Sequence, residues 1–110
     1  MQPRPGVFVS SAGASDWELD PEVPGSEVHV FLEADGVQAG MSRVTEAAEP
    51  LTWTSTAREV FLVLEGAVRI EFADGGPPLE LGVGDMASLP KGVATTWHIT
   101  APFKEMWVLS

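Results

Sequence analysis

The sequence contains no cysteine and no tyrosine, and only six of its 110 residues are lysine or arginine. Without cysteine, the chain forms no disulfide, no thiolate nucleophile and no cysteine-ligated zinc site. Sixteen acidic side chains against six basic ones give a formal net charge of -10. Because this charge repels phosphate backbones and anionic lipid surfaces, we expect neither nucleic acid nor membrane as a partner. A solvated, charged surface is enough to explain this negative net charge.

Long apolar runs and helical periodicity are also missing. No segment approaches the roughly 20 apolar residues that cross a bilayer, and the N-terminal "MQPRPGVFVSS" has no apolar stretch of signal-peptide type. We therefore expect a cytoplasmic location. Apolar side chains do not recur at helical spacing over any long stretch. Because 45% of the residues are hydrophobic, the chain has enough apolar material for the core of one folded domain.

Short β-rich segments alternate with glycine, proline and aspartate, which predicts an all-β fold. Hairpin turns are expected at residues 34–36, 65–66 and 73–76, where Gly or Asp supplies positive φ angles. So many short strands in a small chain predict a sandwich or a closed barrel. We expect residues 1–24 to form an N-terminal strand and arm packed on a barrel of residues 25–110. The predicted strands cover residues 7–10, 27–33, 37–46, 51–55, 59–65, 67–73, 78–82, 85–90, 94–100 and 103–109.

The segment "EVFLVLE" (59–65) is apolar on both faces of its predicted strand. Phe61 and Val63 point to one side, whereas Val60, Leu62 and Leu64 point to the other. One face lines the barrel interior, and the other needs a second layer. Either the N-terminal arm or a second subunit is able to supply that layer. We expect a homodimer as the oligomer.

Two spaced motifs resemble those of the cupin superfamily. Glu59 and Gly66 stand with six residues between them, and the segment "LGVGDMASLPKG" carries Gly84, Pro90 and Gly92 at the spacing of the second motif. From about Gly25 to Leu109, the chain is similar to the small single-domain cupin_3 type. That group includes domains related to ureidoglycine aminohydrolase and to an ethanolamine-utilisation protein. The resemblance implies an RmlC-like jelly-roll, an antiparallel β-barrel.

The same resemblance defines where a cupin metal site would be. Its first two histidine positions fall on Trp53 and Ser55 with one allowed spacing, or on residues 52 and 54, both threonine, with the other. The third histidine position falls on Thr95, so that only Glu59 matches the ligand set. One carboxylate cannot hold a transition metal, which needs about three or four donors. We expect no metal and no other cofactor.

The two histidines do not replace the missing ligands if the strands alternate regularly. His98 then points away from the face that holds Thr95 and Trp97. His29 lies opposite the apolar side chains of strand 27–33. Both are expected at the surface or an interface, and only a slip of register or a bulge would reverse their facing.

The residues left at the predicted barrel mouth resemble a small-molecule site, in which apolar walls surround a few polar groups. Aromatic rings beside a carboxylate also hold amines and other cations. Glu59 is the candidate general acid or base, and Arg43 is its candidate internal partner. An equally simple interpretation is a barrel filled by tryptophan, with Glu59 as a paired structural carboxylate. The candidate binding residues are Trp53, Ser55, Phe61, Thr95, Trp97 and Arg43.

Three functions from different classes fit these residues. The first is a metal-independent enzyme acting on a small metabolite that bears an amine or a carbonyl group, with Glu59 as acid or base. The second is a binding or sensing module that uses the same pocket without chemistry. The third is an accessory structural dimer whose barrel is filled. The sequence favours a cupin that handles a small molecule, and it identifies neither the substrate nor the reaction.

Overall fold

The fold is built from eight β-strands in the part of the chain that a computed structural model describes, residues 4–46 and 49–110. All strand pairs are antiparallel, which confirms the all-β prediction. Within these residues no helix is present that could span a membrane. The strands are β1 (Glu18–Leu19), β2 (Glu27–Ala34), β3 (Val37–Val44), β4 (Leu51–Thr54), β5 (Glu59–Phe72), β6 (Leu79–Gly82), β7 (Met86–Leu89) and β8 (Ala94–Leu109).

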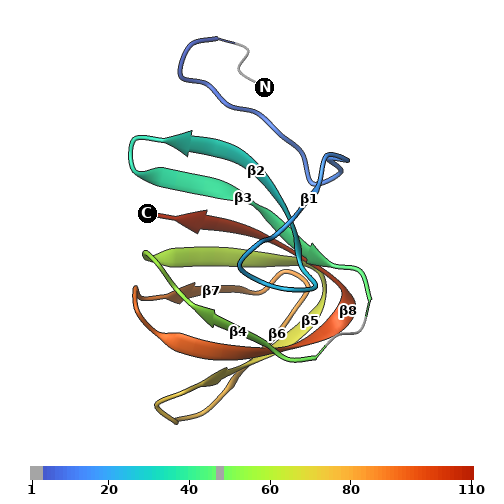
Figure 1. The fold of residues 1–110 in the computed structure, drawn as a ribbon, viewed down its shortest axis with the longest axis vertical. Coiled ribbons are helices and arrows are strands. Elements are labelled where there is room, and N and C mark those ends of the chain that lie inside the picture. The colour runs from blue at the N-terminus through green and yellow to red at the C-terminus, as the bar shows by residue number, and fades with distance from the viewer. Residues whose placement is uncertain (1–3, 47–48) are drawn as a thin grey trace.

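Two long strands, β5 and β8, belong to both walls of the barrel. The first half of β5 pairs with β7 and with the second half of β8, which continues the sheet through β3, β2 and β1. The second half of β5 pairs with β6 and with the first half of β8, on which β4 lies. Figure 1 shows both strands curving around the molecule. Each was predicted as two separate strands, and those predictions are wrong because each chain segment bends without leaving the sheet.

The bend in β5 is made at Gly66, where the sequence predicted a hairpin turn. Gly66 has a φ of 77°, and the register of β5 against β8 shifts on both sides of Glu65. A Cβ atom at Gly66 would collide with the carbonyl oxygen of Pro102 and would lie 2.7 Å from that of Thr100. Glycine is therefore required here by a close approach of two strands, not by a reversal of the chain.

Tight turns occur at the other two predicted places. Asp35 and Gly36 have φ angles of 55° and 77°, and they join β2 to β3 through the pair Ala34 and Val37. Positive φ at both central residues is the geometry of the tightest hairpin turns. Residues 73–76 turn the chain after β5, with the amide of Gly75 donating to the carbonyl of residue 72 at 3.0 Å. Both turn predictions are confirmed.

Apart from the two-residue strand β1, the described part of the N-terminal arm is irregular. The predicted strand at 7–10 is wrong, since only a single bridge between Arg4 and Val7 forms there, and residues 1–3 lie outside the described residues. Farther along the arm, Lys104 of β8 donates to the carbonyl of Ala12 at 3.0 Å, and the ring of Trp17 lies against the Arg43 guanidinium. The start of the arm extends beyond β2, away from the barrel (Figure 1).

The two faces of β5 have different surroundings. Phe61 and Val63 are fully buried in the barrel core, as alternation predicts. On the opposite face, Val60 is 46% exposed. The arm contacts the outer face over β2, β3 and the second half of β8, and none of these contacts reaches the face of β5 for which the sequence requires a second layer.

Replacing Gly66 by alanine tests the bend. We expect Gly66→Ala to lower the free energy of unfolding by about 3 kcal/mol, because the new methyl group meets carbonyl oxygens of β8 and the backbone keeps a positive φ. Gly36→Ala is the matched control, since Gly36 has the same φ of 77° but nothing lies within 4 Å of the place that its Cβ would take. This control should lose only about 1 kcal/mol. Equal losses in urea denaturation would contradict the close-approach argument.

Candidate functional site

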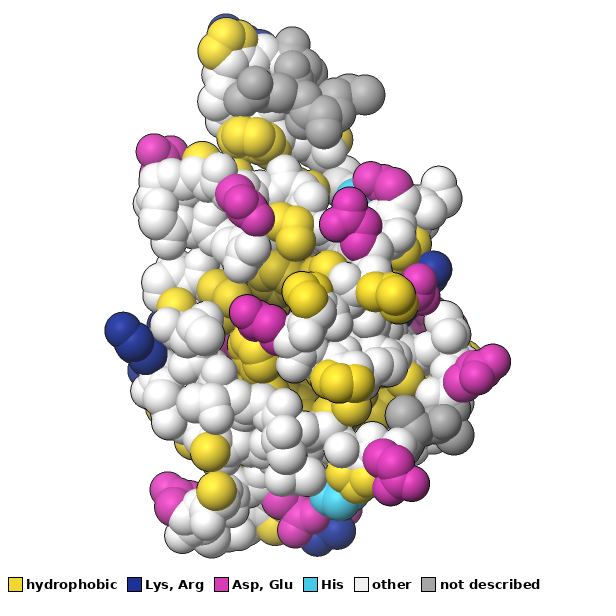
Figure 2. Space-filling model, in the orientation of Figure 1, with side chains coloured by type: hydrophobic (Ala, Val, Ile, Leu, Met, Phe, Trp, Pro, Cys, Tyr) yellow, Lys and Arg dark blue, Asp and Glu magenta, His cyan; other side chains and the backbone are white. Residues whose placement is uncertain are grey.

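A cavity of about 290 Å³ opens between the two walls of the barrel. In Figure 2 hydrophobic side chains form a recess at the centre of the face shown. Four tryptophan or phenylalanine rings and two buried glutamates contribute to the lining, together with aliphatic side chains, a few polar side chains of β3, and residues 20–23 of the loop after β1, which include Asp20 and Glu22. The rings and glutamates are Trp53, Trp97, Phe103, Trp107, Glu59 and Glu105. Apolar walls with few polar groups are typical of small-molecule sites.

Glu59 lies at the start of β5 and is only 4% exposed. Its Oε1 accepts a hydrogen bond from the indole nitrogen of Trp53 at 2.7 Å and another from the hydroxyl of Ser55 at 3.2 Å. Burial raises the pKa of Glu59 above its ordinary value of 4.5, while these two hydrogen bonds lower it in part. The carboxyl group is thus fixed in position, and its pKa is higher than that of an ordinary surface glutamate.

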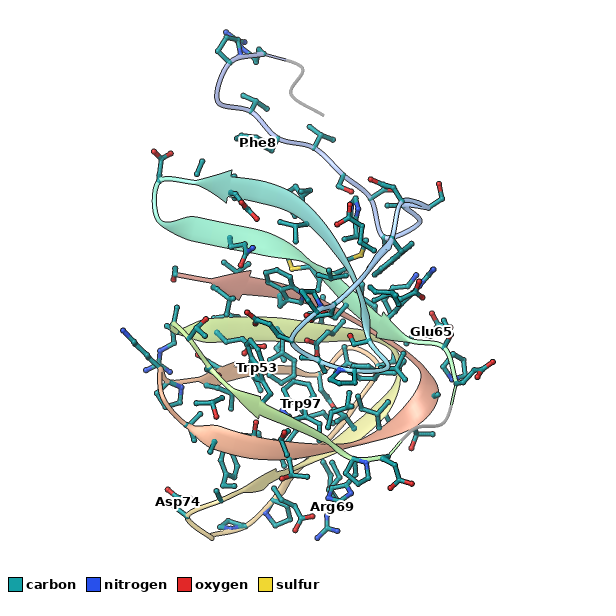
Figure 3. The ribbon with its side chains drawn as sticks, viewed as in Figure 1. Phe8, Trp53, Glu65, Arg69, Asp74 and Trp97 are labelled. Atoms are coloured by element: carbon teal, nitrogen blue, oxygen red, sulfur yellow. The ribbon has the colours of Figure 1, made fainter. Side chains whose placement is uncertain are left out.

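A short chain of hydrogen bonds fixes the tryptophan rings around Glu59. The indole nitrogen of Trp97 donates to Thr95 Oγ1 at 2.9 Å, and Thr95 donates to the carbonyl oxygen of Trp53 at 2.7 Å. Figure 3 shows Trp53 and Trp97 at the centre of the barrel. The Trp97 ring also packs on Phe61, with 5.1 Å between ring centroids. Both indole N–H groups are thus bonded within the protein, Trp53 to Glu59 and Trp97 to Thr95.

The predicted site residues divide between the cavity wall and the layer behind it. Glu59, Trp53, Trp97 and Arg43 line the cavity. The other three predicted residues, Ser55, Phe61 and Thr95, are buried and do not line it. They position the lining residues from behind. Ser55 donates a hydrogen bond to Glu59, and Thr95 donates one to the carbonyl oxygen of Trp53.

The predicted pair of Arg43 with Glu59 is wrong. Arg43 Nε donates to Glu27 Oε1 at 3.0 Å, and its guanidinium lies 4.3 Å from the centroid of the Trp17 ring. Side-chain alternation explains the difference, because Ser42 and Val44 are the members of this part of β3 that face the cavity. Arg43 contributes to the cavity lining while its guanidinium is bonded to Glu27 and stacked on Trp17.

Glu105 is the site residue that sequence reasoning missed. It lies in the second half of β8 on the face of Phe103 and Trp107, and it is 5% exposed. Its Oε2 is buried with no hydrogen-bond partner among the described residues. Alternation in "FKEMWVL" contained the signal, since a carboxyl group there shares the inward face with two aromatic side chains.

The environment of Glu105 disfavours its charged form. Burial, followed by the negative charge of Glu59, raises the pKa of Glu105 well above its ordinary value of 4.5. A buried polar atom without a partner costs stability unless it serves a ligand or another function. The cavity wall therefore contains two buried carboxyl groups, those of Glu59 and Glu105.

Both histidines lie away from the barrel interior. His98 is partly exposed and contacts Glu71 on the neighbouring strand, as its predicted facing requires. His29 is 8% exposed because the arm covers it, with Ser10 Oγ at 2.6 Å from Nε2 and the Asp16 carbonyl at 3.0 Å from Nδ1. The expectation of a surface or interface position for His29 is wrong in this respect, since the chain's own arm buries it.

The residues at the cupin ligand positions do not fit a metal ion. Trp53 and Ser55 direct an N–H and an O–H toward Glu59, whereas a cation requires lone pairs directed toward itself. The hydroxyl of Thr95 is bonded to Trp53 and Trp97. In residues 4–46 and 49–110, no group of three or more His, Cys, Asp or Glu side chains is arranged to hold one.

Comparison with known proteins places this barrel in a family. The model of the EutQ-like cupin domain (Cupin_3) matches residues 31–106. The chain belongs to the EutQ-like cupin domain family. The resemblance noted in the sequence is thereby confirmed. No curated protein matches the chain.

Solved structures agree with this assignment. A putative ethanolamine utilization protein Q from Salmonella typhimurium is 17% identical with a TM-score of 0.70, covering 94% of this chain and 91% of that one. A cupin-2 domain protein from Shewanella frigidimarina is 26% identical with a TM-score of 0.59, covering 74% and 76%. A putative mannose-6-phosphate isomerase from Ralstonia eutropha is 20% identical with a TM-score of 0.66, covering 78% and 84%. At such identities these likenesses establish the fold.

The pH dependence of stability tests the buried state of Glu105. A carboxyl group whose pKa is raised by folding stabilises the protein fully below its unfolded pKa, and this contribution is lost as pH rises through the folded value. Glu105→Gln resembles the protonated form, so its melting temperature should fall less than that of the wild type as pH rises above 4.5. Glu65→Gln, which removes the same charge from a half-exposed position, should follow the wild-type slope. Parallel profiles for all three proteins would contradict the assignment.

Proposed function

We propose that this EutQ-like cupin domain binds a small metabolite bearing an amine or a carbonyl group in the cavity beside Glu59, without a resident metal. The observation that carries the proposal is a carboxyl group fixed by two donors in an open apolar cavity. An unoccupied volume of about 290 Å³ argues against a barrel that is merely filled by its own side chains.

Glu59 is suited to proton transfer in this cavity. Burial raises its pKa above the ordinary value, so the carboxyl group holds a proton more readily than a surface glutamate does. As a carboxylate it accepts a proton from an ammonium group or from a carbon beside a carbonyl. As a carboxylic acid it donates a proton to a carbonyl oxygen. Because Trp53 and Ser55 both bond Oε1, neither of these two contacts engages Oε2.

Glu59→Gln tests this role, because glutamine keeps the shape of the side chain and cannot exchange a proton. Ligands are first identified by ligand-observed NMR with a set of small amines and carbonyl compounds. Any reaction found on them should slow by about 10²–10⁴-fold in Glu59→Gln. Glu65→Gln on the same strand is the control and should keep full activity, since its side chain is half-exposed. Binding and turnover that survive Glu59→Gln unchanged would refute the proposal.

We further propose a homodimer through the outer face of β5 and β7. The arm leaves this face uncovered, and Val60 and Met86 are 46% and 71% exposed on it. Register pairs extend the same face across neighbouring strands as a continuous apolar row. A second copy is able to cover the row symmetrically, with each chain presenting the same patch. The row consists of Met106, Leu62 and Met86, and it ends at Met41, which is only 4% exposed.

Sedimentation of two charge variants tests this assembly. The wild type should sediment at micromolar concentration as a dimer of the 11.7 kDa chain. Met86→Glu combined with Val60→Glu should produce monomer, because desolvating two carboxylates at an apolar contact is unfavourable. Leu19→Glu is the control, since Leu19 is 80% exposed on β1, and it should leave the dimer intact. A wild-type protein that sediments only as monomer would exclude this interface.

A further inference from the structure

The cavity has two polar ends on one inner face of the sheet. Glu59 is paired across the strands with Leu109, whereas Glu105 is paired with Val63 and Ser42. The row between these two levels contains Trp107, which stands opposite Phe61. The two carboxyl groups therefore approach the same enclosure from different levels, with an indole between them.

Trp107 and Ser42 leave Glu105 without a donor. The indole nitrogen of Trp107 donates to Ser42 Oγ at 2.8 Å and not to the carboxyl group. Glu105 Oε2 has no partner among the described residues, although it is buried. This arrangement contrasts with the Glu59 end, where two donors satisfy one carboxylate oxygen.

Basic side chains near the cavity are bound elsewhere. Arg43, which lines the cavity, pairs with Glu27 and stacks on Trp17. Lys104 donates to the arm and lies near Glu65 on the outer face. Neither cation contacts Glu59 or Glu105 in the described structure. Of the four acidic side chains in the lining, Glu59 and Glu105 are buried, and no side-chain cation is bonded to these two in the described residues.

We propose that the ligand is a small organic cation, an alkylammonium ion, whose charged group donates to Glu105 in the field of Glu59 while its carbon chain lies on Trp97 and Trp107. This inference rests on the proposed small-molecule function and specifies its substrate class. An ammonium ion supplies the donors that Glu105 lacks, and indole faces attract cations. A volume of about 290 Å³ restricts the ligand to a compact molecule.

Charge, and not only shape, selects the ligand in this arrangement. A neutral ketone of the same length fills the same space but leaves Glu105 without a charged partner. A carboxylate ligand brings a further acidic group next to two buried ones, Glu59 and Glu105. The preferred order is therefore ammonium over ketone over carboxylate. Glu105→Gln should remove the preference for ammonium, because an amide is neutral at every pH.

The experiment titrates the full chain by calorimetry with n-hexylammonium, 2-hexanone and hexanoate at constant ionic strength. The wild type should bind n-hexylammonium at least about tenfold more tightly than either other compound, as expected for a charged hydrogen bond in an enclosed site. Glu105→Gln should reduce this ratio to about one, whereas Glu65→Gln should preserve it. The wild-type series alone tests the ligand class even if Glu105→Gln does not fold.

The outcomes separate this inference from the proposed function. Tighter binding of 2-hexanone, lost in Glu59→Gln and unchanged in Glu105→Gln, would overturn the cation assignment and leave the proposed small-molecule function standing. Tighter binding of hexanoate would also overturn the assignment. No binding of any of the three compounds would overturn it as well, and failure of the wider amine and carbonyl set would then remove the proposed function. A tenfold preference for n-hexylammonium that Glu105→Gln does not change would show that Glu105 is not the recognising group.

Discussion

The close approach of β5 and β8 at Gly66 is the constraint on which the cavity depends. Both strands bend at this level, so that each passes from one wall of the barrel to the other. Without the bend, β4 and β6 would continue the same flat sheet as β2 and β3, and no enclosure would form. A side chain at Gly66 would meet the backbone of the opposing strand, and backbone atoms cannot rotate away as a side chain does. The sheet closes because one residue contributes no atoms at the point of contact.

The bend also determines which side chains share the enclosure. Glu59 and Glu105 come from the halves of β5 and β8 on one side of it, whereas Trp97 and Thr95 come from the half of β8 on the other side. β4 then brings Trp53 next to Thr95. Hydrogen bonds join these residues at the positions that match the cupin ligand set. The polarity of the site is consequently reversed, since donors converge on a carboxylate where lone pairs would converge on a cation.

Alternation and spacing in the sequence predicted much of the fold but only part of the site. The face of Phe61 and Val63, the hairpin at 34–36 and the burial of Glu59 follow from local patterns. The continuity of β5 and β8 does not follow from them, because a glycine at position 66 fits a hairpin turn and a bend within a strand equally well. The position of Arg43 depended on side-chain direction, and the cover over His29 depended on where a distant arm lies. The contact with the arm leaves no periodic pattern, whereas the directions of Arg43 and Glu105 were readable from alternation and were overlooked.

The two buried acidic groups of the cavity and the net charge of the whole chain act in the same direction. A formal charge of -10 produces a negative potential around the molecule, which attracts cations and repels anions over about 8–10 Å at moderate salt. Surface carboxylates are screened, but a low-dielectric cavity strengthens the field of the groups inside it. The general field therefore favours the approach of a cation, and Glu59 and Glu105 supply the local discrimination. Because Glu105 resists ionisation in the empty cavity, a cationic ligand that stabilises its carboxylate form displaces a proton, which links occupancy of the site to pH.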